Sequence, residues 1–310
     1  MLNKEDYKNI IINSLFFNGL ISKELYLKCG KKPNYSLSSL SNIIKNRLNQ
    51  FNEKYALNNK NNNIEHSICM DKDGEVLILE NGTKDNVPIM VDSAFSKLIN
   101  KRYKKLHDDY WSKNKITKEE YTEKIIKELN KNNNGIYHAH THPGPYKNTD
   151  LNNPIPTCFS EADIKSAFLQ PVTLVTGVKL YNVMKSQIAL STNGTSMMLI
   201  NHNPIGTKPN FDEKKLMTAY KHLSENWDEY VWDTNDYIHY KIHNGTTWNQ
   251  LEKYPNLTKN EVTEIVKKKV YQEINKRNHE HFPEINKDVI KEFDELGFEL
   301  KYDFTEVNIK

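Results

Sequence analysis

A stretch with a period of two residues constrains the fold of this chain more than any other feature. In IYHAHTHPG, residues 136 to 144, histidines alternate with other residues before a Pro-Gly pair. Successive side chains of a strand point to opposite faces. The pattern therefore predicts a strand over 136–142, which begins after the turn at Asn134-Gly135 and ends at Pro143. On that strand three histidines share one face with Ile136: His138, His140 and His142.

The flanking patterns predict a mixed α/β fold around this strand. IEHSICMDKDGEVLILENG, residues 64 to 82, has two apolar runs on either side of Asp73-Gly74, as in a β-hairpin. Apolar residues then recur at helical spacing over 94–107 and 116–129, and the second segment opens with the capping-box pair Thr117 and Glu120. Three short strands are expected within 171–200. The predicted fold class is α/β (α+β), with a mixed central β-sheet flanked by helices.

Changes in pattern divide the chain into three predicted parts. Apolar residues at helical spacing predict a helical N-terminal extension over 1–57, and the Asn-rich run 58–63 reads as a surface linker. The central domain is expected over 64–203. A helical C-terminal region is expected over 204–310, where an apolar stripe predicts a long helix: Val262, Val266, Val270 and Ile274.

Composition narrows the classes of partner and compartment. A hydrophobic content of 37% is adequate for a buried core, and 43 basic residues against 40 acidic ones give no global field that favours nucleic acid. No apolar run approaches the roughly 20 residues of a membrane span. The three cysteines form no CxxC pair and leave one odd thiol, which favours a reducing, cytoplasmic location: Cys29, Cys69 and Cys158. Export as an effector remains an open alternative.

Two segments together predict a metal site. Imidazoles at positions i and i+2 of a strand project from the same face, about 6–7 Å apart at the backbone, so His140 and His142 can converge on one ion. The segment FSEAD supplies a third ligand. Ser160 can cap a helix, and Asp163 then lies in the first turn, where the positive end of the helix dipole favours an ionised carboxylate.

HTHPGP followed by SEAD resembles the HxHP and SxxD halves of the JAMM signature of MPN/JAB-domain zinc metalloproteases. The resemblance covers about residues 65–200 and implies a cytidine deaminase-like architecture. It implies Zn²⁺ held by His140, His142 and Asp163, with Ser160 as a supporting hydroxyl. The family's general-base glutamate precedes a hairpin strand, and Glu65 fits that place better than Glu53, Glu75 or Glu80. Seventeen residues separate His142 from Ser160, more than is usual in the family, which indicates an inserted loop.

The resemblance implies hydrolysis of an amide or isopeptide bond in a protein or peptide substrate, with the C-terminus of a ubiquitin-like protein as one candidate. Two other classes remain open. A catalytically silent scaffold would use the same fold to bind a protein partner. A nucleic-acid-associated protein would act through its terminal helices, although no concentrated basic face supports that reading. For His138, a place beside the ligands or on the surface is expected, and for Cys158 a small buried thiol.

Overall fold

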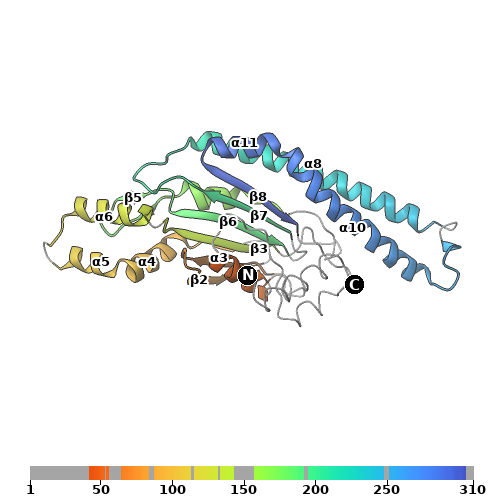
Figure 1. Cartoon of the computed structure of the whole chain (residues 1–310), viewed down its shortest axis with the longest axis horizontal. Helices are drawn as coiled ribbons and strands as arrows, with labels where there is room; N and C mark the ends of the chain where they lie inside the picture. Colours follow the sequence, from red (N-terminus) through yellow and green to blue (C-terminus); the bar gives the residue numbers. More distant parts are fainter. Residues whose placement is uncertain are drawn as a thin grey trace, which may run out of the picture.

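A six-stranded mixed sheet forms the centre of the molecule in the computed structural model (Figure 1). The strand order is β2-β1-β3-β6-β7-β8, in which β3 and β6 are parallel and every other neighbouring pair is antiparallel. The strands are β1 (His66–Met70), β2 (Val76–Asn81), β3 (Ile136–His142), β6 (Met184–Ser191), β7 (Thr195–Asn201) and β8 (Phe298–Phe304). The structure describes residues 42–52, 54–55, 64–83, 87–112, 115–131, 133–142, 157–191, 195–247 and 251–304.

Helices cover both faces of this sheet. The helices of the described residues are α3 (Asn42–Asn52), α4 (Val91–Arg102), α5 (Lys104–Trp111), α6 (Lys118–Lys131), α7 (Glu161–Ile164) with its π-helical continuation η2 (Lys165–Leu169), α8 (Glu213–Gly245), α10 (Lys259–Ile285) and α11 (Lys287–Glu295). In the larger core, apolar residues of α4, α6, η2, α8 and α11 pack against one face of the sheet. A smaller core packs α3 against the other face. Both faces of the sheet are therefore buried, which explains why every residue of β1 and β6 is buried.

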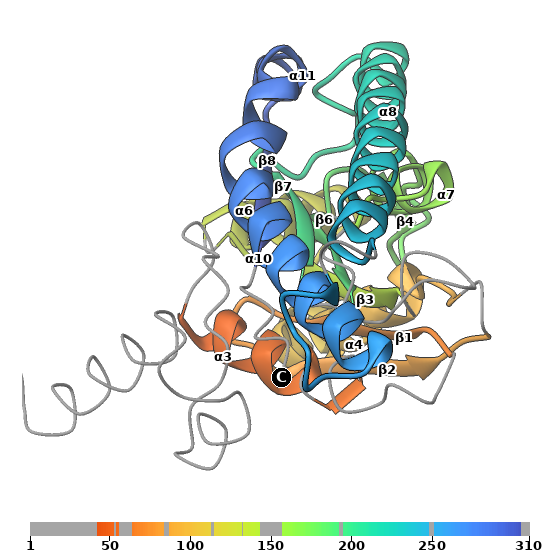
Figure 2. The same cartoon turned by 90° about the vertical axis from the view of Figure 1, so that its right-hand side faces the viewer.

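The two longest helices, α8 and α10, lie side by side and extend well beyond the sheet (Figures 1 and 2). Apolar side chains from both helices make a separate small core along this pair: Ile238, Val270, Tyr271 and Ile274. The base of α8 joins the main core through Leu216 and Leu223, both fully buried. Within the described residues, no helix has both the length and the apolar character needed to cross a membrane.

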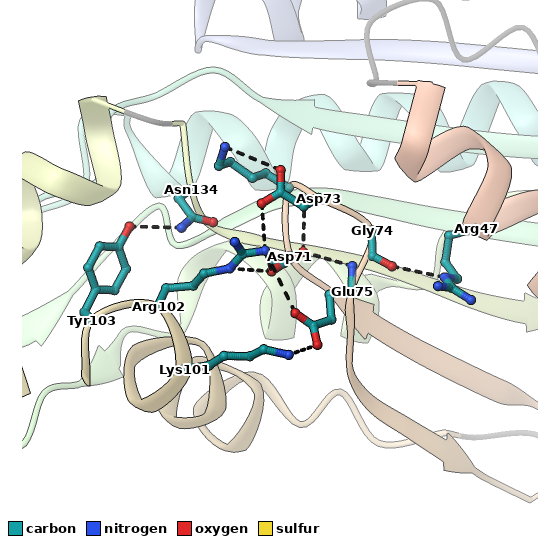
Figure 3. A network of polar contacts seen from close by, with 10 residues as sticks. Arg47, Asp71, Asp73, Gly74, Glu75, Lys101, Arg102, Tyr103 and Asn134 are labelled. Atoms are coloured by element: carbon teal, nitrogen blue, oxygen red, sulfur yellow. Dashed lines mark hydrogen bonds and ion pairs between the residues drawn. The ribbon is translucent and has the colours of Figure 1, made fainter. Parts of the chain in front are cut away.

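The β1–β2 turn is fixed by a buried carboxylate (Figure 3). Asp71 is fully buried, and its Oδ1 accepts hydrogen bonds of 2.9 Å from the backbone N–H groups of Asp73 and Glu75. Its Oδ2 pairs with the guanidinium of Arg102 at the end of α4. Because a buried charge is costly unless it is paired, this network fixes the hairpin and ties α4 to it. Gly74, at φ +72°, supplies the left-handed backbone that the turn requires.

A close backbone approach positions the start of β3. A Cβ at Gly135 would lie 2.3 Å from the carbonyl oxygen of Val183, so only glycine lets the chain enter β3 beside β6. From there β3 and β6 run in parallel register, with His138 beside Gln187 and His140 beside Ala189. This pairing carries the histidines to the end of the strand.

Most of the predicted central elements are confirmed. The strand over 136–142 has the predicted bounds, the 64–82 segment forms the β1–β2 hairpin, and Thr117 and Glu120 make the predicted capping box. The helix expected over 94–107 is broken at Tyr103 into α4 and α5. The predicted N-terminal extension is described only over α3 and residues 54–55; its other helices and the 58–63 linker lie outside the described residues.

Two predictions about the later chain need correction. The 171–200 segment holds four strands rather than three, because β4 (Val172–Thr173) and β5 (Lys179–Leu180) form a small separate sheet before β6 and β7. The 204–310 region is not purely helical, since β8 pairs with β7 and completes the central sheet. The sheet therefore crosses the boundary expected at residue 203. The mixed α/β class with a central mixed sheet flanked by helices is confirmed.

Candidate metal centre

Three predicted ligands from two separate segments meet at the end of β3. The Nε2 atoms of His140 and His142 lie 2.7 Å apart, and Oδ1 of Asp163 lies 3.5 Å from Nε2 of His140. One candidate ligand atom from each of the three residues lies within 4.8 Å of the other two. Among the described residues this is the one group of three or more histidine, cysteine and acidic side chains that could hold a metal ion.

The strand pattern explains how the two imidazoles come together. In β3 the side chains of Tyr137 and Ala139 enter the smaller core with α3, on one face. The histidines alternate with them and project to the opposite face, as their spacing predicts. His140 is 2% exposed and His142 is partly buried. A ligand pair of this kind therefore follows from the two-residue period of the strand and its position at the end of the sheet.

A capping box places Asp163. Ser160 is the N-cap of α7, and its hydroxyl accepts a 3.1 Å hydrogen bond from the backbone N–H of Asp163. In return, Oδ2 of Asp163 accepts from the backbone N–H of Ser160 at 2.7 Å and from its hydroxyl at 2.8 Å. One carboxylate oxygen is thus held by the cap, while Oδ1 faces His140. The cap fixes the carboxylate and leaves one oxygen available to a metal.

The electrostatics keep two of the ligands in the form that binds metals. Burial alone would raise the pKa of Asp163, but the nearby His140 and His142 and the Ser160 N–H outweigh it and hold the pKa well below its usual value. Burial and the neighbouring His140 lower the pKa of His142 to about 3. Burial also acts to lower the pKa of His140, but the charges of Asp163 and Glu65 raise it overall. At neutral pH the carboxylate is ionised and His142 is neutral, which are their ligand forms.

Glu65 lies one residue before β1, near enough to this centre for its charge to act on His140. Its backbone N–H donates to Thr83 O and its carbonyl accepts from Gly82 N–H, each at 2.8 Å, so it extends the β1–β2 hairpin. The next residues of the chain pair with β3: Ser67 lies opposite His140, and the backbone N–H of His66 donates to the Thr141 hydroxyl at 2.9 Å. The half-buried Glu65 is close enough that its charge helps to raise the pKa of His140.

The competing glutamates have other surroundings. Glu75 pairs with Lys101 in the turn network of Figure 3. Glu80 lies on β2, where its charge adds to burial in raising the pKa of Cys69 to about 12. Glu53 lies outside the described residues. Among the three candidate glutamates that the structure describes, Glu65 is the one whose charge acts on His140.

Two polar side chains beside the ligands were not identified from the sequence. Gln187 of β6 is fully buried, and its carboxamide lies between His138 and His140. The hydroxyl of Thr157 lies 3.3 Å from Nδ1 of His142. Neither residue belongs to a recognisable motif. The signal that could have found Gln187 is the parallel pairing of β3 with β6, which the sequence does not specify.

The structure also shows where His138 and Cys158 lie. His138 is fully buried beside His140, so the surface alternative is wrong. Cys158 is a buried thiol, as expected, and burial raises its pKa. The inserted loop expected between His142 and Ser160 lies, over residues 143–156, outside the described part of the chain.

The arrangement as a whole is a site that could hold a metal ion, with two imidazoles and one carboxylate as ligands. Such a set leaves coordination positions for water and a substrate, as catalytic sites require. Comparison of the chain with protein-family models, with curated proteins and with solved structures finds no match.

Proposed function

We propose that this protein is a zinc-dependent hydrolase that cleaves an amide or isopeptide bond in a protein or peptide substrate. The observation that carries the proposal is the convergence of His140, His142 and Asp163 within 4.8 Å, from two segments that resemble the two halves of the JAMM signature. A ubiquitin-like C-terminus is the substrate that this resemblance favours.

The donor set supports zinc as the metal. Two imidazole nitrogens and one carboxylate oxygen, with a fourth position open, are typical of catalytic zinc sites. Hard cations such as Ca²⁺ and Mg²⁺ prefer sites built from oxygen ligands. Both free thiols of the described residues, Cys69 and Cys158, are buried. Neither belongs to the ligand group, so the site is not of the thiolate-rich structural kind.

Zinc, when bound, supplies a Lewis acid that activates water and polarises the scissile carbonyl. The chain itself supplies the proton transfers. The carboxylate of Glu65 takes a proton from the attacking water and delivers it to the leaving amine. Its half-buried position and the effect of its charge on the pKa of His140 support this role.

Ser160 has two roles in the proposal. In the described structure its hydroxyl proton points to Oδ2 of Asp163, and it thereby orients the ligand. Ser160 is also exposed, so its hydroxyl can rotate toward a substrate and donate to the oxyanion that develops during the attack. A single donor of this kind contributes on the order of 3 kcal/mol in other enzymes.

The test is a cleavage assay on purified protein with a panel of ubiquitin-like fusions and isopeptide-linked conjugates, with and without chelator. We expect chelator-sensitive cleavage that zinc restores. His140→Ala should lose both zinc and cleavage, whereas Glu65→Gln should keep zinc and lose turnover. His281→Ala, on the exposed surface of α10, is the matched control and should behave as the wild type.

Two outcomes would contradict the proposal. Full activity in excess chelator would exclude a metal-dependent reaction. Stoichiometric zinc without cleavage of any amide or isopeptide substrate would favour a scaffold that keeps the metal for structure.

A further inference from the structure

Gln187 lies in the interior of the sheet, directly behind the candidate ligands. It is fully buried on β6 and pairs in register with His138 on β3. Its Oε1 lies 2.6 Å from Nδ1 of His138, and its Nε2 lies 3.4 Å from Nδ1 of His140. A single carboxamide therefore bridges the two imidazoles at the ring nitrogens that face away from the metal position.

Because of this bridge, the two imidazoles carry their protons on different ring nitrogens. A carboxamide accepts hydrogen bonds at its oxygen and donates at its nitrogen. In the described orientation His138 donates from Nδ1 to the oxygen of Gln187, while the nitrogen of Gln187 faces a bare Nδ1 on His140. Neutral His140 then carries its proton on Nε2, which lies between His142 and Asp163. That is the tautomer of a metal-free site, because a metal would occupy Nε2.

A bound metal requires the opposite arrangement. A histidine that binds through Nε2 carries its proton on Nδ1 and needs an acceptor there, and such acceptors orient the ring and raise its basicity. The oxygen of Gln187 becomes that acceptor if the carboxamide turns by half a rotation. Its nitrogen then donates to Nδ1 of His138, whose proton moves to Nε2. That Nε2 is buried and has no hydrogen-bond partner among the described residues, so the shift breaks no existing bond there.

We propose that Gln187 is a positioning residue for the metal ligand His140, and that its carboxamide turns over on metal binding while His138 takes the opposite tautomer. Each imidazole keeps one proton throughout, so the exchange is neutral. The inference rests on the metal site of the proposed function but not on its hydrolytic activity.

The test combines zinc affinity with the tautomer states of the histidines. Zinc affinity is measured by competition with a chromophoric chelator, and tautomers by ¹⁵N–¹H correlation spectra of the histidine rings, with and without zinc. In the wild type, zinc should move the ring proton of His140 from Nε2 to Nδ1 and that of His138 from Nδ1 to Nε2. Gln187→Leu, which removes the acceptor, should weaken zinc binding about 10–100-fold.

Two further variants separate positioning from packing. Gln187→Glu keeps an acceptor at both ends, so zinc affinity should be restored and His138 should keep its proton on Nδ1 in the zinc-bound state. Ser186→Ala is the matched control, because it changes a buried residue next in the same strand whose side chain points to the other face. It should leave zinc affinity and both tautomers unchanged. Gln187→Glu keeps the test decisive if Gln187→Leu fails to fold.

The possible failures can be told apart. Wild-type zinc affinity in folded Gln187→Leu, or an unchanged His138 tautomer in zinc-loaded wild type, would overturn the inference and leave the proposed function standing. A wild type that binds zinc and shifts both tautomers but cleaves nothing would support the inference and contradict the proposed function. A wild type that binds no zinc would overturn both.

Discussion

Helices α7 and α10 begin with the same local structure but differ in what surrounds it. At α7, Ser160 and Asp163 exchange hydrogen bonds in a capping box, and at α10, Thr258 and Glu261 do the same. Both acids accept from the backbone N–H of the cap at 2.7 Å and from its hydroxyl at 2.8 Å. Each acid has a lowered pKa.

The difference lies beyond the cap. Glu261 is exposed, and hydrogen bonds from Thr258 are what lower its pKa. Asp163 is largely buried, and the imidazoles of His140 and His142 lower its pKa against the opposing effect of burial. A capping box orients an acid but does not make a site. Asp163 is a candidate metal ligand because its capping box lies beside the histidines at the end of β3.

The largest expected contrast between the two boxes is in zinc binding. Asp163→Asn removes a charged ligand oxygen but keeps the shape of the side chain and an acceptor for the cap. We expect it to weaken zinc binding by more than about a hundredfold, beyond the usual effect of losing a residue that only supports a ligand. Glu261→Gln should bind zinc as the wild type does. Competition titrations on both variants measure the contrast, and equal affinities would remove Asp163 from the site.

The second contrast concerns the cap hydroxyls. Ser160→Ala and Thr258→Ala should each lower the free energy of unfolding by about 1 kcal/mol, the usual cost of losing an N-cap. Only Ser160→Ala should also weaken zinc binding, by about 10-fold, because Oδ2 of Asp163 loses a partner that orients it. Urea denaturation and zinc titration test the two effects separately. A loss of zinc affinity in Thr258→Ala would show that the effect is a general result of destabilisation.

A smaller effect is expected in the coupling between residues. In a double-mutant cycle on stability without zinc, Ser160→Ala and Asp163→Asn should be non-additive by about 0.5–1 kcal/mol, because the two side chains bond each other. Asp163→Asn and Glu261→Gln, at the starts of two different helices, should add within about 0.5 kcal/mol. Coupling of the second pair as strong as that of the first would contradict the independence of the two boxes.

The smallest effect is the pH dependence of the α10 box. The pKa of Glu261 is lowered in the folded state, so its ionised form stabilises the fold above the pKa of the unfolded chain. That contribution is lost as the pH falls through the lower folded pKa. The urea midpoint of the wild type should therefore exceed that of Glu261→Gln at pH 7, and the difference should shrink as the pH falls through the folded-state pKa of Glu261. A difference that grows on acidification would have the wrong sign.

The site was predictable from the sequence where it depends on local patterns. A two-residue period fixed the bounds of β3 and the face of its histidines, and the spacing of Ser160 and Asp163 predicted the capping box at α7. These features depend on backbone geometry over a few residues. Their convergence was expected, and Oδ1 of Asp163 lies 3.5 Å from Nε2 of His140.

The features that were missed depend on contacts distant in the sequence. Strand β8 follows the helices α8, α10 and α11 and pairs with β7 across about a hundred residues, so no local signal distinguishes it from the end of a helical region. Gln187 faces the histidines because β6 lies parallel to β3, a partnership that periodicity does not reveal. At the break between α4 and α5, the hydroxyl of Tyr103 accepts a 2.9 Å hydrogen bond from Asn134, a contact that the local pattern does not reveal.

The central claim is that His140, His142 and Asp163 bind one zinc ion. X-ray absorption spectroscopy at the zinc edge of the stoichiometrically loaded wild-type protein tests it most directly. We expect nitrogen and oxygen neighbours at about 2.0–2.1 Å, the scattering signature of two imidazoles, and no sulfur. In His140→Ala that imidazole signature should fall or the zinc should be lost. A sulfur neighbour near about 2.3 Å, or an unchanged spectrum in His140→Ala, would contradict the claim.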